Sequence, residues 1–118
     1  MYKLPVGFDG NFLVGKRLEM VCFSAHQVFL HFGSEILITI ESDFSLRPMS
    51  EPGVGRVKLP VVQSDLMKLL EHAVAQATGD SSGTLTIEFD DGHLLACFDT
   101  SEQYESYSIK NGEQVIIV

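Results

Sequence analysis

The chain has 118 residues, of which 45% are hydrophobic and 20% charged, a composition typical of one folded domain with a buried core rather than of a disordered segment. Its formal net charge is −8, which disfavours binding to nucleic-acid phosphates, because that binding needs clustered lysine and arginine. The longest apolar runs are far too short to span a bilayer. We therefore predict a single domain over residues 1–118 that contacts neither nucleic acid nor membrane.

The N-terminal sequence and the cysteines indicate the cytoplasm. MYKLPVGFDGNF lacks a basic stretch followed by an apolar one, so no secretory signal is expected. Cys22 and Cys97 both lie in apolar runs, which favours buried reduced thiols over a disulfide.

The first half of the sequence predicts strands. Polar and apolar residues roughly alternate over residues 16–23 and 26–32, as a half-buried strand requires. We expect the next strand, which begins at Ile36, to follow a three-residue loop, because a loop of two residues would turn the apolar sets to opposite faces. The expected cross-strand pairs are Phe32–Ile36, Leu30–Ile38 and Val28–Ile40.

The middle of the chain predicts a loop and then the only helix. Residues 43–58 contain two prolines and two glycines, which favours an irregular loop with short edge strands on either side. The helix is expected over about residues 65–78, with Ser64 as its N-cap and Gly79 as its stop. Its apolar face recurs at three- and four-residue steps. The residues of that face are Leu66, Leu69, Leu70, Ala73, Val74 and Ala77.

Two hairpins complete the predicted sheet. Asp91-Gly92 favours a two-residue type I′ turn. With that turn, the expected pairs are Asp90–His93, Phe89–Leu94, Ile87–Ala96 and Leu85–Phe98. Asn111-Gly112 predicts a second turn, which places Tyr107 opposite Ile116.

These elements predict an α+β fold, in which an antiparallel sheet of hairpins and a meander is packed by the single helix. One helix cannot cover both faces of a sheet, so we expect the sheet to fold over on itself or to form a homodimer. The apolar residues expected on the second face are Phe29, Leu37, Leu95 and Cys97.

The acidic residues are concentrated in the last part of the chain. Residues 1–68 carry seven acids and seven bases, whereas residues 69–118 carry nine acids and only Lys110 as a base. We interpret the excess as a continuous outward-facing patch that would speed encounter with a basic protein. The alternative is that the acids only keep a small domain soluble.

The stretch FDTSEQYESYSIKNG, residues 98–112, is the densest group of polar side chains in the sequence. In an extended strand Glu105 lies on the same side as Tyr107, and a carboxylate there needs a partner or a place at the rim. Tyr107, Arg17 or Arg47 would be that partner. Two interpretations of Glu105 remain open, a structural role at the margin of the sheet and a functional role. The candidate binding residues are Asp99, Glu102, Tyr104, Glu105 and Tyr107.

Patterns of catalysis and metal binding are weak. No GxSxG elbow occurs, and both cysteines fall in the middle of predicted strands, where a reactive thiolate would be poorly placed. The four histidines, His26, His31, His72 and His93, are scattered along the sequence, and His72 is interpreted as a residue at the boundary of the helix face. We expect no cofactor and no metal, and we lean against an enzyme.

Several stretches carry a resemblance: FLVGKRLEMVCF, QVFLHF, ILITIES, FDDGHLLACFDTS and, above all, YESY followed by Ile109. Together they resemble a family of small uncharacterised bacterial proteins of about this length, known only as a domain of unknown function. The resemblance covers nearly the whole chain. It implies no activity, cofactor or catalytic residue for any position.

The leading functional hypothesis is a non-enzymatic protein-binding module, such as an immunity-like or regulatory partner of a basic protein. The alternative is a small-molecule-binding protein or minor enzyme with a pocket near Tyr104, Glu105 and Tyr107. A third hypothesis is a purely structural subunit, which a large apolar dimer face would indicate.

Overall fold

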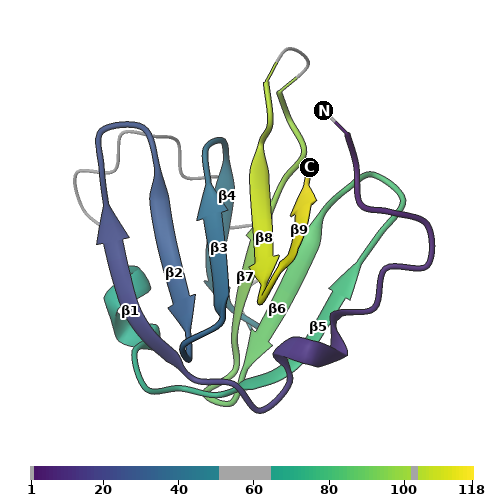
Figure 1. The fold of residues 1–118 in the computed structure, drawn as a ribbon. Coiled ribbons are helices and arrows are strands. Elements are labelled where there is room, and N and C mark those ends of the chain that lie inside the picture. The colour runs from purple at the N-terminus through teal and green to yellow at the C-terminus, as the bar shows by residue number, and fades with distance from the viewer. Residues whose placement is uncertain (1, 51–64, 102–103) are drawn as a thin grey trace.

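The computed structural model describes residues 2–50, 65–101 and 104–118. In these residues the chain forms two antiparallel sheets (Figure 1). The five-stranded sheet has the order β1 (Leu18–Phe23), β2 (Val28–Phe32), β3 (Ile36–Ile40), β8 (Tyr107–Asn111) and β9 (Gln114–Ile117). The four-stranded sheet has the order β4 (Phe44–Pro48), β7 (His93–Cys97), β6 (Leu85–Phe89) and β5 (Val74–Gly79). Two short 3-10 helices, η1 (Gly10–Leu13) and η2 (Asp65–Leu69), accompany the sheets.

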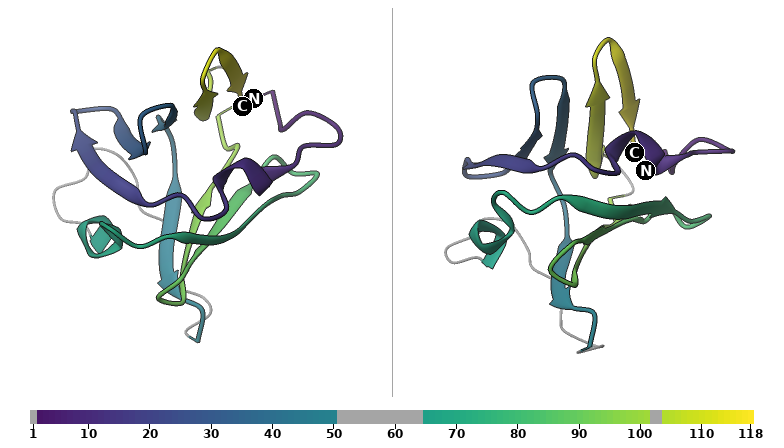
Figure 2. Two further views of the ribbon diagram at one scale, coloured as in Figure 1. Left: turned by 60° about the horizontal axis from the view of Figure 1, so that its bottom comes forward. Right: turned by 90° about the horizontal axis from the view of Figure 1, so that it is seen from below.

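The core lies between the two sheets, which form separate layers (Figure 2). Apolar residues alternate along the strands, so each strand turns one row of side chains inward. Phe32 on β2 and Phe89 on β6 stack with ring centroids 6.3 Å apart and an interplanar angle of 22°. This pair joins the inner faces of the two sheets within the core.

The two sheets are also joined at one corner by backbone hydrogen bonds. Arg17 forms an isolated antiparallel bridge with Ala73, and Leu18 donates its N–H to the carbonyl of His72 over 3.1 Å. Glu71 adopts a φ of 69°, a left-handed conformation that a residue with a side chain adopts at some cost. This residue turns the chain from η2 into β5 and so brings His72 to the corner.

The expected α+β fold with a helix over residues 65–78 is wrong. No α-helix occurs in the described residues; η2 ends at Leu69, and Val74–Gly79 is the strand β5. A β-bulge between Val74 and Gln76 inserts one extra residue. Val74 and Ala77 are therefore both buried although they lie three residues apart, and this spacing imitates a helical face. Ser64, the expected N-cap, lies outside the described residues.

The β2–β3 hairpin is confirmed in register. Phe32 pairs with Ile36, Leu30 with Ile38, and Val28 with Ile40. The short edge strand expected beside the loop of residues 43–58 is observed as β4, and Pro48 ends it, where its missing N–H disrupts no ladder. Residues 51–64 of that loop lie outside the described residues.

The β6–β7 turn is correctly located, but its predicted register is wrong by one residue. Ile87 pairs with Leu95 and Leu85 with Cys97, because the loop has three residues and ends at Gly92, whose φ is 87°. A glycine in the left-handed conformation at this position is typical of three-residue hairpins. Leu95 and Cys97, expected on the second face, are therefore fully buried in the core.

The β8–β9 turn is shifted in the same way. Ile109, not Tyr107, pairs with Ile116, and Asn111 pairs with Gln114. The two turn residues are Gly112, with a φ of 61°, and Glu113. A two-residue turn with glycine in its first position at positive φ is favoured in hairpins, so glycine sets the register here too.

Candidate functional site

Two of the five predicted binding residues, Asp99 and Tyr107, take separate structural roles. The hydroxyl of the buried Ser106 accepts hydrogen bonds from the backbone N–H groups of Thr100 and Ser101, over 3.2 and 3.1 Å, and donates to Asp99 over 3.3 Å. The other oxygen of Asp99 accepts from the N–H of Lys3 over 2.8 Å. Asp99 therefore ties the N-terminal segment to the approach of β8.

Two of the predicted residues, Tyr104 and Tyr107, differ sharply in burial. Tyr107 is fully buried, and its hydroxyl donates to the carbonyl of Gly83 over 2.6 Å. Burial raises the pKa of Tyr107 far above its usual range, so its hydroxyl keeps its proton. Tyr104 is 72% exposed, and Glu102 lies outside the described residues. The exposed Tyr104 and the buried Tyr107 therefore do not form one binding surface.

Glu105 lies against a second carboxylate. Its partner is Glu41, which follows β3 and accepts a hydrogen bond from the side-chain amide of Gln27 over 2.9 Å. Partial burial, and then the proximity of Glu41, raise the pKa of Glu105. A shared proton or a cation between the two carboxylates would relieve their repulsion.

Replacing Glu105 with glutamine is expected to stabilise the protein at neutral pH by less than about 1 kcal/mol, because both carboxylates are only partly buried and solvent screens their repulsion. The pKa of Glu105 is raised in the folded state. Just above the ordinary glutamate pKa of about 4.3, the folded chain therefore keeps a proton on Glu105 that the unfolded chain has lost. The stability of the natural chain falls as the pH rises from there through the raised folded-state pKa. Urea unfolding of both proteins at several pH values measures the difference.

The advantage of the Glu105→Gln variant should vanish below about pH 4, where both states are protonated. Glu113→Gln, at the exposed β8–β9 turn, is the control and should change the unfolding free energy by less than about 0.5 kcal/mol. An advantage of Glu105→Gln that grows towards low pH would contradict the assignment.

The outer face of the five-stranded sheet is apolar at many positions. Strand pairing brings two rows of side chains across all five strands on the side away from the core. We define the outer face by these rows: Met20, His31, Leu37, Lys110 and Val115 in one, and Cys22, Phe29, Thr39, Ser108 and Ile117 in the other. Val115 is 55%, Met20 48% and Ile117 44% exposed. Phe29 and Leu37 lie on this face, as predicted, and are half-buried.

Glutamates lie at both ends of the strands that form the outer face. None of the paired positions of the face itself is an acid. We call the surrounding residues the acidic rim: Glu19, Glu35 and Glu113 at one end, and Glu41 and Glu105 at the other. In Figure 1 these are the lower and upper ends of the front sheet. Lys16 and Lys110 offset part of this charge.

The acids of residues 69–118 do not gather in one continuous patch. Asp80 lies in the β5–β6 turn, where its carboxylate accepts from the N–H groups of Ser82 and Thr84. Asp90 and Asp91 lie in the β6–β7 turn, at the opposite end of β6. Acids are thus distributed around the molecule, and the acidic surface that surrounds an apolar face includes glutamates from the first half of the chain.

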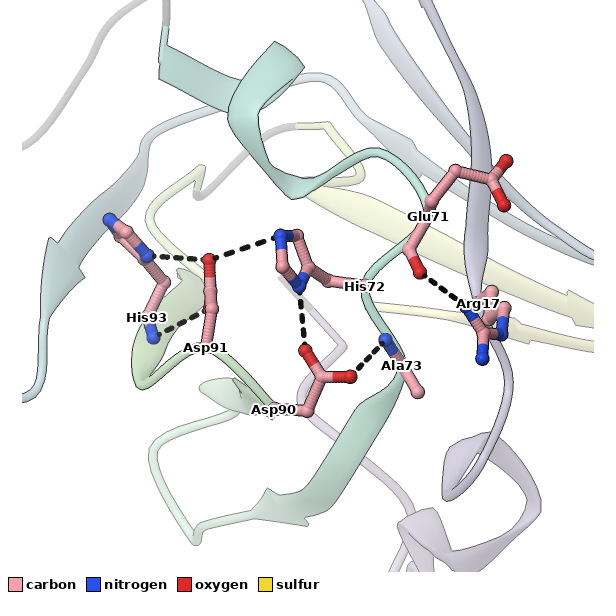
Figure 3. Close-up of polar contacts among 7 residues, drawn as sticks. All are labelled: Arg17, Glu71, His72, Ala73, Asp90, Asp91 and His93. Atoms are coloured by element: carbon pink, nitrogen blue, oxygen red, sulfur yellow. Dashed lines mark hydrogen bonds and ion pairs between the residues drawn. The ribbon is translucent and has the colours of Figure 1, made fainter.

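A cluster of two histidines and two aspartates lies at the corner where the sheets join (Figure 3). His72 Nδ1 is 2.7 Å from Asp90 Oδ1, and His72 Nε2 is 3.8 Å from Asp91 Oδ2. His93 Nδ1 is 2.9 Å from the same oxygen of Asp91. The sequence shows these histidines as scattered, but the pairing of β5 with β6 brings them together.

Hydrogen bonds hold both aspartates of this cluster ionised. The N–H of Ala73, and then His72, lower the pKa of Asp90. Desolvation alone would raise the pKa of Asp91, but hydrogen bonds from the backbone and ring of His93 lower it overall. The cluster is therefore a set of fixed acceptors around the imidazole of His72.

Two clefts of the described surface are lined by residues other than Tyr104, Glu105 and Tyr107. One of about 530 Å³ is bordered by the N-terminal segment and by residues 79–81, and one of about 280 Å³ by Phe12, Lys16 and Glu35 among others. Buried Cys97, whose pKa burial raises to about 12, lies in the core rather than at a cleft. These features do not favour the predicted small-molecule pocket near Tyr104, Glu105 and Tyr107.

In the described part of the chain, no helix has the length and apolar character needed to cross a bilayer. Comparison with protein families matches residues 11–118 to the "Family of unknown function (DUF6188)". No curated protein and no solved structure matches the chain.

Proposed function

Because the chain belongs to the DUF6188 family of unknown function, we propose its role from its surface: it is a non-enzymatic protein-binding module. The docking surface is the outer face of the five-stranded sheet. The observation that carries this proposal is the exposure of Met20, Val115 and Ile117 on a sheet face that has no acid at its paired positions. An immunity-like or regulatory partner of another protein would use a docking surface of this kind.

The outer face and the acidic rim together resemble the anatomy of a protein interface. Such interfaces have an apolar centre that is depleted of charged residues and a polar, solvent-accessible edge. By contrast, the outer face of the four-stranded sheet mixes small, polar and charged side chains, including Arg47 and Glu88. The contrast favours the five-stranded sheet as the docking surface.

The partner is a basic protein with an apolar patch, rather than a second copy of the chain. Each copy carries a net charge of −8, and the rim would place glutamates of two copies against each other. Like charges brought together in an interface oppose association. A basic partner instead gains from the long-range attraction and from ion pairs at the rim.

Glu41 and Glu105 offer a specific position for a basic side chain of the partner. The two carboxylates repel each other, and the amide of Gln27 compensates only one oxygen of Glu41. An arginine or lysine of the partner would stabilise the ionised form of both. On this account Glu105→Gln strengthens the fold slightly and weakens binding.

Quantitative capture from the cells that make the protein tests the proposal. The bait is the full chain, and the readout is the amount and isoelectric point of the protein retained at low and at high salt. The double variant Met20→Asp, Val115→Asp is expected to lose at least about 90% of a basic protein that the natural chain retains, because charged groups would be buried in the interface. Retention is also expected to fall with salt.

Matched variants separate the surface from the net charge. Thr78→Asp adds one negative charge, as Met20→Asp alone does, but on the outer face of the four-stranded sheet. It should retain the partner, whereas Glu35→Gln with Glu113→Gln should weaken retention several-fold. Retention of an acidic protein, equal loss with Thr78→Asp, or retention of the chain itself as a dimer would each overturn the proposal.

A further inference from the structure

The corner cluster contains an imidazole whose proton position is set by its neighbours. Asp90 accepts from the N–H of Ala73 over 3.1 Å with one oxygen, and its other oxygen lies 2.7 Å from His72 Nδ1. A carboxylate held in this way is an acceptor, so the neutral ring of His72 carries its proton on Nδ1. The lone pair of Nε2 is then directed away from Asp90.

The free nitrogen of His72 faces a second acceptor. Nε2 lies 3.8 Å from Asp91 Oδ2, too far for a direct hydrogen bond. Asp91 is itself held by the backbone N–H of His93 over 3.0 Å and by the ring of His93 over 2.9 Å. Two acceptors that face each other across this distance leave room for a cation that binds both.

The separation suits a transition-metal ion. Zinc lies about 2.0–2.1 Å from a histidine nitrogen and about 2.0–2.2 Å from a carboxylate oxygen, so one ion reaches both atoms across 3.8 Å with a bent angle at the metal. One ligand atom each from His72, Asp90 and Asp91 lies within 4.8 Å of the others.

We propose that this cluster binds a divalent transition-metal ion of the zinc class, with His72 Nε2 and Asp91 Oδ2 as protein ligands and water in the remaining positions. Asp90 is a positioning residue, because it holds the Nδ1 proton of His72, as carboxylates commonly do behind metal-bound histidines. His93 orients Asp91 in the same manner. The mixed nitrogen and oxygen set favours zinc-class ions over magnesium.

The site is independent of the outer face. It lies at the start of β5 and in the β6–β7 turn, on the four-stranded sheet and its junction with β1 (Figure 3). A bound ion would link the β6–β7 turn to the segment that follows η2. Failure of the metal proposal and failure of the protein-binding proposal are therefore distinguishable.

Titration of the metal-free full chain with zinc chloride, followed by calorimetry and by NMR of the histidine rings, tests the proposal. Saturable one-to-one binding is expected, with shifts at His72 and His93. Cobalt(II) provides a second readout, because its visible absorption reports ligation by nitrogen and oxygen. His72→Gln should weaken binding at least about tenfold, and Asp90→Asn should weaken it by about 10–100-fold while changing the cobalt spectrum.

His31→Gln, on the outer face, is the control and should bind zinc as the natural chain does. Thermal unfolding of each variant shows whether it is folded, and Asp91→Asn provides a second ligand variant if His72→Gln does not fold. Absence of binding at millimolar zinc, undiminished binding by folded His72→Gln and Asp91→Asn, or shifts confined to His26 and His31 would each overturn the proposal.

Discussion

Replacing Phe89 with alanine is expected to lower the free energy of unfolding by about 3–5 kcal/mol. Phe89 is 1% exposed and stacks on Phe32 of the opposite sheet. Its removal takes away this contact between β6 and β2 and leaves a cavity that the paired strands cannot readily close. Since domains are stable by only about 5–15 kcal/mol, the variant should be close to unfolding. Urea denaturation at 25 °C measures the loss.

Phe23→Ala is the matched control for this substitution. Phe23 ends β1 and is 43% exposed, so the same truncation should cost less than about 1 kcal/mol. Equal losses at the two positions would contradict the placement of the core between the sheets.

Tyr107→Phe has the second largest expected effect, a loss of about 1–3 kcal/mol. The substitution keeps the ring but removes the donor that reaches the carbonyl of Gly83 over 2.6 Å. Tyr107 is fully buried, so its ring in the variant would leave that carbonyl without its hydrogen bond. The bond links β8 of one sheet to the β5–β6 turn of the other. Chemical denaturation and amide exchange at Gly83 measure the effect.

Tyr104→Phe removes the same hydroxyl from a side chain that is 72% exposed and should leave stability within about 0.5 kcal/mol. A stable Tyr107→Phe variant with unchanged exchange at Gly83 would show that the hydroxyl does not join the sheets.

The register of a hairpin was predictable from the sequence where only one loop length kept the apolar side chains on a single face of the sheet. At the β2–β3 hairpin, a slip of one residue would have exposed Ile36 and Ile38, so the apolar pattern selected the observed pairing. At the β6–β7 hairpin both faces carry apolar residues, such as Leu94 and Leu95. The pattern therefore did not distinguish a loop of two residues from one of three, and Leu95 and Cys97 were assigned to the wrong face.

The helix could not be distinguished from a bulged strand by spacing. A bulge shifts the period of two by one residue, and Val74 and Ala77 then repeat as they would on a helix. The end of η2 also depends on the left-handed Glu71, and glutamate, unlike glycine, does not signal such a conformation. Tertiary pairing with β6 decided the outcome.

The prediction of a helix over residues 65–78 also prevented the corner cluster from being deduced. His72 and Asp90 are 18 residues apart, and they meet because β5 pairs with β6 at Val74 and Phe89. If residues 74–79 are placed in a helix, that pairing cannot be deduced. The acidic rim likewise depends on strand ends from both halves of the chain, which charge counting along the sequence does not reveal.

Site-specific photo-crosslinking tests the proposed docking surface most directly. A photoreactive residue is placed at Ile117 on the outer face or at Thr78 on the other sheet, and the protein is irradiated in the cells that make it. We predict that position 117, but not position 78, crosslinks a basic protein in the cells. In a second experiment on a lysate of the same cells, 0.5 M salt added before irradiation should abolish the product. Crosslinking from position 78 alone, to a second copy of the chain, or to an acidic protein would contradict the account.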